Sequence, residues 1–305
     1  MPSSTTQTGQ FEYVSTGGYF HSLPGDTLRR FIDASAEVQR ALGFGNEKDH
    51  PEVAPSQFEM NYGYTEATIA ADQVQLYKLI ARQVAAQLDL TASFLPKPVM
   101  NVNGSGCHTN ISIAKNSKNL FFDKKGRAGL SEFAWAFINR ILANADDLCL
   151  ILNSSVNAYR RLDPHFEAPN QIKVSASDRG SMIRIPIGNE RTARIEVRSI
   201  APDANPYLAI YALLKTGLEG PSSDGDSGGK RQRTRYLPDN IYDAIRLFRT
   251  SRYALDLLGD HVHEKYAEVK LAAAERSPKS LGTRVKRSEI IFHHEVTNQY
   301  LWNQF

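Results

Sequence analysis

The sequence predicts an α+β fold in which a largely antiparallel sheet is flanked by helices. Several segments carry apolar residues at helical spacing, and others carry β-branched residues with a period of two. The two kinds of segment do not alternate regularly, as they would in a parallel βαβ protein, so an α+β arrangement is favoured. The length of 305 residues is enough for a large core.

Two helices and a strand region are expected in the first third of the chain. Asp26 is placed to cap a helix whose apolar residues recur until Gly43. Residues 46–64 carry many polar residues and two prolines, which indicates strand and loop. Residues 65–88 have the pattern of a long amphipathic helix. Residues 99–113 read as strand, glycine turn and strand.

The remainder of the chain carries both helical and strand patterns. Residues 130–152 read as one helix, with Ser131 as its cap. Residues 171–198 are rich in β-branched residues with a period of two, which predicts two or three strands. Residues 206–218 and 240–303 read as helices.

Composition and charge set limits on the domain organisation and on the partners. Residues 1–10 form a polar tail, and residues 11–305 are expected to be one domain with a flexible loop at 221–235. The net charge of +3 gives no argument for nucleic-acid or membrane binding. Two cysteines do not make a disulfide framework, and the tail lacks the apolar core of a signal peptide, so a cytoplasmic protein is expected.

A glycine-rich segment, residues 103–108 (NGSGCH), leads into a predicted strand. The glycines let the backbone turn tightly and approach a ligand closely. His108 and Asn110 would share one face of the strand, where the histidine could bind a metal or a phosphate. The alternative is a tight hairpin with a hydrogen-bonded histidine, and this segment alone favours that alternative.

Two glutamates lie close together in residues 52–59 (EVAPSQFE), just after Glu47 and His50. Hard cations such as Mg²⁺ and Mn²⁺ need several carboxylate oxygens, and Glu52 and Glu59 could supply them. The alternative is a loop with solvated carboxylates, which is the usual environment of glutamate. Taken alone, the segment favours the solvated loop.

The segment 194–198 (RIEVR) carries the strongest signal. It places three charged side chains on one face of a strand and two apolar side chains on the other. Further arginines precede it at 160, 161, 179 and 184. Arginine binds phosphate and carboxylate in forked pairs, so this set suits a polyphosphate and an acidic substrate. A surface ladder of salt bridges is an equally weighted alternative.

In the order in which they occur, these segments resemble the glutamine synthetase family, in the part that forms its catalytic, C-terminal domain. The resemblance covers residues from about 17 to 220 and depends on many short matches in one order. The matching segments are GGYF at 17–20, EVAP at 52–55, FLPKP at 94–98, NGSG at 103–106, GLSE at 129–132, FEAP at 166–169, IRIP at 183–186, RIEVR at 194–198 and DANPY at 203–207.

The resemblance implies an activity and its cofactors. The family joins ammonia to glutamate with ATP, through γ-glutamyl phosphate, and uses two divalent cations, Mg²⁺ or Mn²⁺. It also implies a homo-oligomer, if the family's front domain is not essential for assembly, with glutamate, ammonia and ATP as partners. A glutamate–amine ligase and a non-catalytic relative are the alternatives, because both would keep the same segments.

The resemblance also implies a role for each matching position. The metal ligands are Glu52 and Glu59 for one ion, and His108 and Glu196 for the other. The residues at the transferring phosphoryl group are Arg184 and Arg194, with Glu167 on a flap that helps to deprotonate ammonium. The residues that hold glutamate are Asn103, Gly104, Arg161, Arg179 and Arg198. The residues on the nucleotide side are Glu47, His50, Ser112 and Arg191.

Several family features are expected to be missing. No match is found for the front β-rich domain or for the strand that brings one further glutamate to each cation. Asn110 stands where many members have a second histidine, Pro51 lies in the histidine-rich approach, and Arg191 stands where lysine is common. Each metal site is therefore expected to bind its ion more weakly than in the family.

Overall fold

The computed structural model describes residues 13–19, 25–99, 101–162, 168–222 and 233–275. The chain divides into two compact units, Met1–Ser105 with Arg276–Phe305, and Gly106–Glu275. The predicted polar tail, Glu167, most of the predicted loop at 221–235 and the predicted helices beyond 275 lie outside the described residues. The expectation of one domain over 11–305 stays a prediction.

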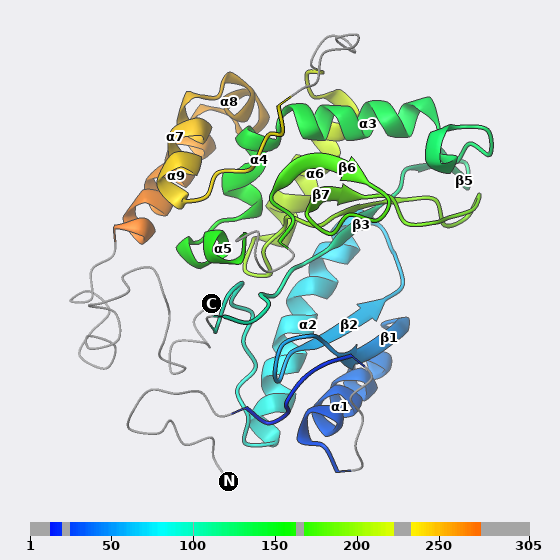
Figure 1. The fold of residues 1–305 in the computed structure, drawn as a ribbon, viewed down its shortest axis with the longest axis vertical. Coiled ribbons are helices and arrows are strands. Elements are labelled where there is room, and N and C mark those ends of the chain that lie inside the picture. The colour runs from blue at the N-terminus through cyan, green and yellow to red at the C-terminus, as the bar shows by residue number, and fades with distance from the viewer. Residues whose placement is uncertain (1–12, 20–24, 100, 163–167, 223–232, 276–305) are drawn as a thin grey trace. The chain divides into compact units, whose positions relative to one another are not determined.

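The first unit combines two helices with a two-stranded antiparallel sheet (Figure 1). Its elements are α1 (Thr27–Ala41), β1 (Asn46–Pro51), β2 (Phe58–Tyr62) and α2 (Ala67–Gln87). The Asp26 carboxylate accepts from the backbone N–H of Arg29, as the predicted helix cap requires. Leu28, Phe31 and Ile32 of α1 pack with Ile80 and Val84 of α2 in one buried cluster, so the two helices form the core of this unit.

The second unit contains a four-stranded sheet in the order β3-β8-β7-β6. Its strands are β3 (Thr109–Ile111), β6 (Gln171–Ser175), β7 (Ser181–Arg184) and β8 (Ile195–Val197). The pairs β3/β8 and β8/β7 are antiparallel, and β7/β6 is parallel. The predicted largely antiparallel sheet in an α+β fold is thereby confirmed.

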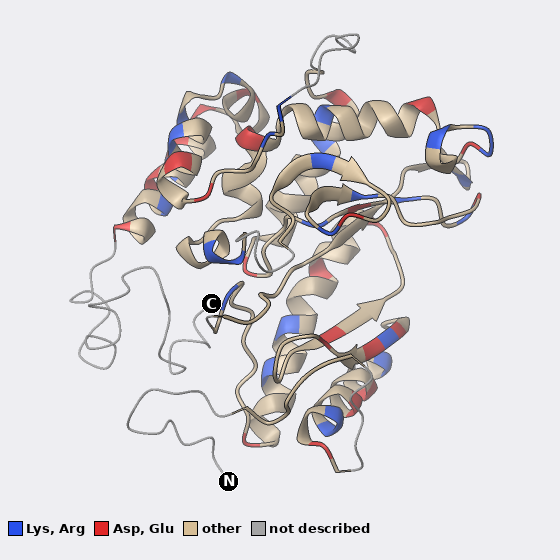
Figure 2. Ribbon diagram, viewed as in Figure 1, with Lys and Arg blue, Asp and Glu red and all other residues tan. Residues whose placement is uncertain are grey.

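Helices surround this sheet (Figure 1). They are α3 (Glu132–Ala143), α4 (Ala145–Leu152), α5 (Val156–Arg161), α6 (Pro206–Glu219), α7 (Ile241–Thr250), α8 (Arg252–Leu258) and α9 (Asp260–Ala274). Between β3 and α3 lie a small hairpin, β4 (Ala114–Lys115) with β5 (Lys118–Asn119), and a 3₁₀ turn, η1 (Arg127–Gly129). Charges of both signs are mixed along α7 and α9, so these helices present no surface of a single sign (Figure 2).

Two sequence expectations about elements were wrong. Residues 130–152 form two helices rather than one, because the Asn144 side chain donates to the carbonyls of Arg140 and Pro221 at the junction. Residues 99 and 101–108 contain no strand, and within 99–113 only β3 is extended in a sheet. The backbone before β3 is fixed by single bonds instead, such as Cys107 N–H to Ile200 O at 2.9 Å.

None of the helices in the described part of the chain is both long enough and apolar enough to cross a membrane.

Candidate functional site

The second unit holds a charged cluster centred on β8. Ile195 and Val197 are completely buried on one face of this strand, and Glu196 points to the other, as the alternation predicts. The sheet register places Glu196 opposite Arg184 on β7 and opposite Asn110 on β3. Neighbouring strands therefore bring residues distant in sequence to one side of the sheet.

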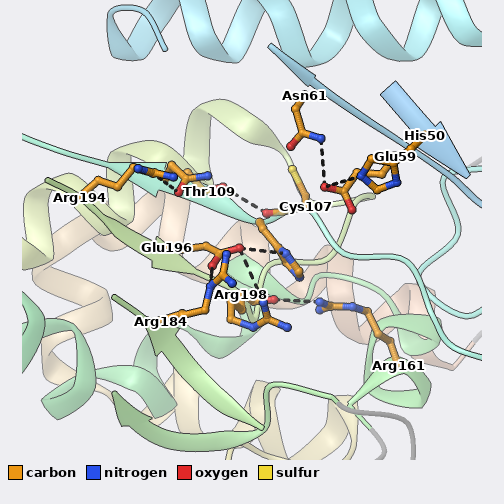
Figure 3. Close-up of polar contacts among 12 residues, drawn as sticks. His50, Glu59, Asn61, Cys107, Thr109, Arg161, Arg184, Arg194, Glu196 and Arg198 are labelled. Carbon is orange, nitrogen blue, oxygen red and sulfur yellow. Dashed lines mark hydrogen bonds and ion pairs between the residues drawn. The ribbon is translucent and has the colours of Figure 1, made fainter. Parts of the chain in front are cut away.

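Three side chains contact the Glu196 carboxylate (Figure 3). His108 Nδ1 lies 3.2 Å from Oε1, Arg198 Nη1 lies 3.7 Å from Oε1, and the Arg184 Nε–H donates to Oε2. The side chain of Glu196 is 6% exposed, whereas those of His108 and Arg184 are 35% and 40% exposed. We call His108, Arg184, Glu196 and Arg198 the Glu196 cluster; a ligand can reach it from solvent past His108 and Arg184.

The charges in this cluster do not balance. Burial raises the pKa of Glu196, but the hydrogen bond and charge of His108, and then those of Arg184, outweigh it and hold that pKa at about 2. Burial, together with Arg161 and Arg198, lowers the pKa of His108 although a third of its side chain is exposed. At pH 7 the Glu196 cluster therefore holds two guanidinium groups, one carboxylate and a neutral imidazole, and this surplus of positive charge favours an anionic ligand. Arg161 lies close by, and the carboxylate of Asp203 acts on its charge.

Arg161, at the end of α5, supplies the clearest open donor. It is 5% exposed, and its Nη2–H donates to the Arg198 carbonyl at 2.8 Å. Among the described residues its Nη1 has no hydrogen-bond partner. Burial and the neighbouring Arg198 lower the pKa of Arg161 to about 10, so the group stays charged at pH 7. A buried, charged donor without a partner is costly unless a carboxylate or phosphate completes it.

Gly106 makes room for this arrangement. A Cβ at this position would lie 2.9 Å from His108 Nε2 and 3.1 Å from Arg161 Cζ, with Arg161 Nη2 closer still. The sequence indicated only that this glycine belongs to a tight turn that lets the backbone approach a ligand. Its packing role depends on Arg161, which lies far away in the sequence, and no local pattern could have indicated it.

Arg194, which directly precedes β8, is held by a residue of β3 and by the turn before it. Its Nε–H donates to Asn110 Oδ1 at 3.0 Å and its Nη1–H to the Thr192 carbonyl at 3.1 Å. Asn110 was noted in the sequence as a departure from the family, and in the structure it is a partner of Arg194. Ser112, Arg179 and Arg191 are exposed residues of the same unit, and their substrate and nucleotide roles stay predictions.

The first unit holds a second cluster, on β1 and β2. His50 lies directly opposite Glu59 in the register, and Glu52 follows the end of β1. One ligand atom from each of His50, Glu52 and Glu59 lies within 4.8 Å of the other two. We call these residues the His50 cluster (Figure 3 labels His50 and Glu59). Burial, and then the hydrogen bond with Glu59, raise the pKa of Glu52.

Neighbouring groups orient the two carboxylates. Asn61 Nδ2 donates to Glu59 Oε1 at 3.1 Å, and the Val53 N–H donates to Glu52 Oε2 at 2.7 Å. Asn61 was not singled out from the sequence, although its two-residue spacing from Glu59 on a strand could have indicated the shared face. Glu47, on the same strand as His50, is exposed and lies outside the cluster.

The glycine-rich segment is anchored by Gln57, which lies between Glu52 and Glu59 in the sequence. Gln57 Nε2 donates to the Gly104 carbonyl and to Ser105 Oγ, both at 3.0 Å. This bond fixes the backbone next to Asn103. The predicted contacts of Asn103 and Gly104 with glutamate stay predictions.

The His50 cluster offers three donor groups that fit a divalent cation, and within the Glu196 cluster His108 and Glu196 offer two. Two ligands bound to one ion at ~2.1 Å lie ~3 Å apart when adjacent and ~4 Å apart when opposite. The separation of His108 Nδ1 from Glu196 Oε1 is 3.2 Å, and that of His50 Nε2 from Glu59 Oε1 is 4.0 Å. Oxygen and imidazole nitrogen are ligands that Mn²⁺ accepts, and Mg²⁺ accepts the oxygens.

Comparison with known proteins identifies the family. Residues 2–287 match the family described as glutamine synthetase, catalytic domain. The chain belongs to the glutamine synthetase catalytic-domain family. Glutamine synthetases of Staphylococcus aureus strain MRSA252 and of Staphylococcus epidermidis are 36% and 35% identical to it over 276 residues. These matches cover 85% of the chain and 61% of each relative, so the chain spans less than two thirds of their length.

Solved structures of similar fold agree with this membership. A GmaS/ADP complex superposes with a TM-score of 0.75 at 29% identity, covering 93% of this chain and 70% of the other. GmaS without ligand superposes with a TM-score of 0.72 at 30% identity, covering 94% of this chain and 68% of the other. Glutamine synthetase of Plasmodium falciparum superposes with a TM-score of 0.77 at 22% identity, covering 90% of this chain and 64% of the other. At this identity the match shows a likeness of fold. The resemblance to the glutamine synthetase family stated from the sequence is confirmed.

Proposed function

We propose that this protein joins ammonia to the γ-carboxylate of glutamate at the expense of ATP, through γ-glutamyl phosphate. The observation that carries the proposal is the buried guanidinium of Arg161 with an open nitrogen, next to a cluster with surplus positive charge. Membership of the glutamine synthetase family supports the choice of substrates.

The reaction proceeds in two steps. An oxygen of the glutamate γ-carboxylate attacks the γ-phosphorus of ATP, and the bond to the ADP oxygen breaks. The amine nitrogen then attacks the γ-carbon, phosphate leaves, and the nitrogen loses a proton. In this proposal Glu167, which lies outside the described residues, accepts that proton.

The arginines neutralise charge in these steps. Arg184 and Arg194 face the negative charge that spreads over the transferring phosphoryl oxygens. Arg161, Arg179 and Arg198 hold the glutamate carboxylates and the acyl phosphate in forked pairs. Arg194 is already oriented by Asn110, so less conformational freedom is lost when the substrate binds.

Two divalent cations complete the proposal. Glu52 and Glu59 would hold one, and His108 and Glu196 the other; when bound, the ions screen the negative charge of the phosphates. Asn61 and the Val53 N–H would keep the carboxylates of the first site in place. Asn103 and Gly104 would contact glutamate, and Glu47, His50, Ser112 and Arg191 the nucleotide.

One assay tests the proposal. Purified protein is incubated with ATP, Mn²⁺ or Mg²⁺, glutamate and either ammonia, methylamine, ethylamine or hydroxylamine. Phosphate release and the mass of the γ-glutamyl product are measured. Product with ammonia supports the proposal, and product only with the larger amines indicates a glutamate–amine ligase. ATP binding without product from any amine contradicts a catalytic role.

A matched pair of variants separates the arginine site from general effects. Arg161→Met removes the buried donor and should abolish product formation. Arg246→Met removes an arginine on α7 whose side chain is 65% exposed, and it should leave the rate unchanged. Equal rates for both variants and the native protein would rule out Arg161 as a substrate contact.

A further inference from the structure

The side-chain amide of Gln57 bonds at both of its ends. Its Oε1 accepts from the Ala54 N–H at 3.1 Å, and its Nε2 donates to the Gly104 carbonyl and to Ser105 Oγ. These partners fix the orientation of the amide, because a flipped amide would place its oxygen against the Gly104 carbonyl. Both Nε2–H groups are used, so Gln57 has no donor left for a substrate.

The backbone that carries Gln57 is fixed by bonds of its own. Its N–H donates to the Ala54 carbonyl at 3.1 Å, and its carbonyl accepts from the Glu52 N–H at 2.8 Å. The neighbouring Ser56 has a left-handed backbone, with a φ of 59°, and its N–H donates to the Ser15 carbonyl at 3.1 Å. Gln57 therefore projects from a turn that is held on two sides, and it can serve as an anchor for a second segment.

Gln57 and Pro96 hold one peptide group of the glycine-rich segment from its two ends. The Gly104 carbonyl and the Ser105 N–H belong to the same peptide group, and this N–H donates to the Pro96 carbonyl at 2.8 Å. Gly104 has no Cβ, so the peptide group that follows it turns at little steric cost unless both of its ends are bonded. Residues 102–105 belong to no helix or strand that could prevent this rotation. All these contacts lie within the first unit.

We propose that Gln57 is a positioning residue, which holds the peptide group between Gly104 and Ser105 in the orientation that binds glutamate. The inference rests on the proposed function, in which Asn103 and Gly104 contact this substrate. Gln57 acts through Gly104 rather than on the substrate, because both of its N–H donors are already used. Its loss therefore weakens the binding of glutamate and leaves the binding of ATP unchanged.

Variants of the full chain separate this role from general effects. Gln57→Met keeps the length of the side chain and removes every bond of the amide. Gln57→Glu keeps an acceptor for the Ala54 N–H, but it sets a carboxylate oxygen against the Gly104 carbonyl, so only the bond within the turn survives. Gln75→Met is the matched control, because Gln75 is an exposed residue of α2 in the same unit. Thermal unfolding checks that each variant folds.

Glutamate binding is measured by calorimetry with Mn²⁺ present, the KM values in the ligase assay, and the mobility of the loop by hydrogen exchange of a peptide spanning residues 102–106. Gln57→Met should raise the Kd and KM for glutamate about tenfold, while kcat and the KM for ATP stay within about threefold. Exchange of the Ser105 amide hydrogen should be at least about fivefold faster. Gln57→Glu should change all of these values in the same direction, and Gln75→Met should match the native protein. Ser105→Ala removes one of the two acceptors of Nε2 and should raise the KM for glutamate about two- to threefold.

Three outcomes overturn the inference. Native affinity for glutamate in a folded Gln57→Met variant would show that the bond to Gly104 does not support binding. An equal rise in the KM for glutamate and for ATP would show a general loss of structure instead of a positioning role. If neither Gln57 variant folds, an unchanged KM for glutamate in Ser105→Ala overturns it. A native protein that binds glutamate in the Gln57-dependent way but forms no product would contradict the proposed function alone, so the two claims are separable.

Discussion

Replacing Gly106 by alanine tests the geometry around Arg161 with a single methyl group. The glycine does not have a left-handed backbone conformation, so alanine introduces no strain in φ. The new Cβ would lie 2.9 Å from His108 Nε2 and nearer still to Arg161 Nη2. One of the two side chains must therefore move.

The magnitude follows from what Arg161 loses if it moves. Its guanidinium is 5% exposed and donates to the Arg198 carbonyl at 2.8 Å, so it cannot swing into solvent without breaking that bond. A hydrogen bond from a charged donor contributes ~1.5–3 kcal/mol, and overpacking costs ~1–3 kcal/mol. The Arg161 side chain either stays in the crowded position or loses its hydrogen bond to the Arg198 carbonyl. In both cases we expect the free energy of unfolding to fall by ~2 kcal/mol.

The assay combines unfolding with binding. For a unit of this size ~2 kcal/mol lowers Tm by ~4–8 °C. The KM for glutamate should rise at least tenfold, since ~1.4 kcal/mol of lost binding corresponds to a factor of ten. Gly45→Ala is the matched control, because its Cβ would be 4.0 Å from the nearest atom, Gly63 N. A Gly106→Ala protein with the native Tm and glutamate KM would refute the reasoning.

Three further predictions concern the same sheet. Glu196→Gln removes the carboxylate that pairs with Arg184 and Arg198, and urea unfolding should show a free energy of unfolding lower by ~2 kcal/mol. The loss is smaller than for a fully buried pair because the Arg184 side chain is 40% exposed. An unchanged free energy of unfolding would contradict a contribution of this ion pair to stability. Without metal, the free energy of unfolding should fall as pH drops from ~6.5 toward 3. The folded pKa of both His108 and Glu196 lies below the unfolded value, so the unfolded state binds more protons. Protonation of His108 lowers the free energy of unfolding first, and protonation of Glu196 lowers it further below pH ~4.5, by ~3 kcal/mol at most. A free energy of unfolding that is independent of pH over this range would contradict the two pKa shifts. Asn110→Ala removes the acceptor of Arg194 and should lower kcat about tenfold while the KM for glutamate stays constant; a changed KM alone would place Arg194 at glutamate instead.

The strand containing Glu196 could be predicted from the sequence because its pattern is local. Ile195 and Val197 alternate with charged residues, and the structure buries both apolar side chains completely. The caps at Asp26 and Ser131 were predictable for the same reason, since each side chain bonds to a backbone N–H three residues later. Local chemistry decides these elements.

The break between α3 and α4 could not be predicted. No glycine or proline marks it, and Asn144 ends α3 partly by donating to the Pro221 carbonyl, far along the chain. A helical period continues through such a junction, so the pattern of apolar residues suggests one helix.

The residues of the candidate site could be predicted from the sequence, but the differences in burial and orientation among them could not. The sequence weighted all the arginines alike, whereas the structure separates the buried Arg161 from the exposed Arg179 and Arg191. The direction of the His50 ring depends on its contact with the Pro51 carbonyl. Burial and ring orientation arise from tertiary packing, which a single sequence does not display.

Transfer of the γ-phosphoryl group to the glutamate carboxylate is the central claim, and an isotope measurement tests it most directly. Glutamate labelled with ¹⁸O in its γ-carboxylate is supplied with ATP, Mn²⁺ and ammonia, and the released phosphate is analysed by mass spectrometry. An acyl-phosphate route predicts one ¹⁸O atom in each phosphate formed. Phosphate that is released with no ¹⁸O, at the same rate with and without glutamate, would contradict the account.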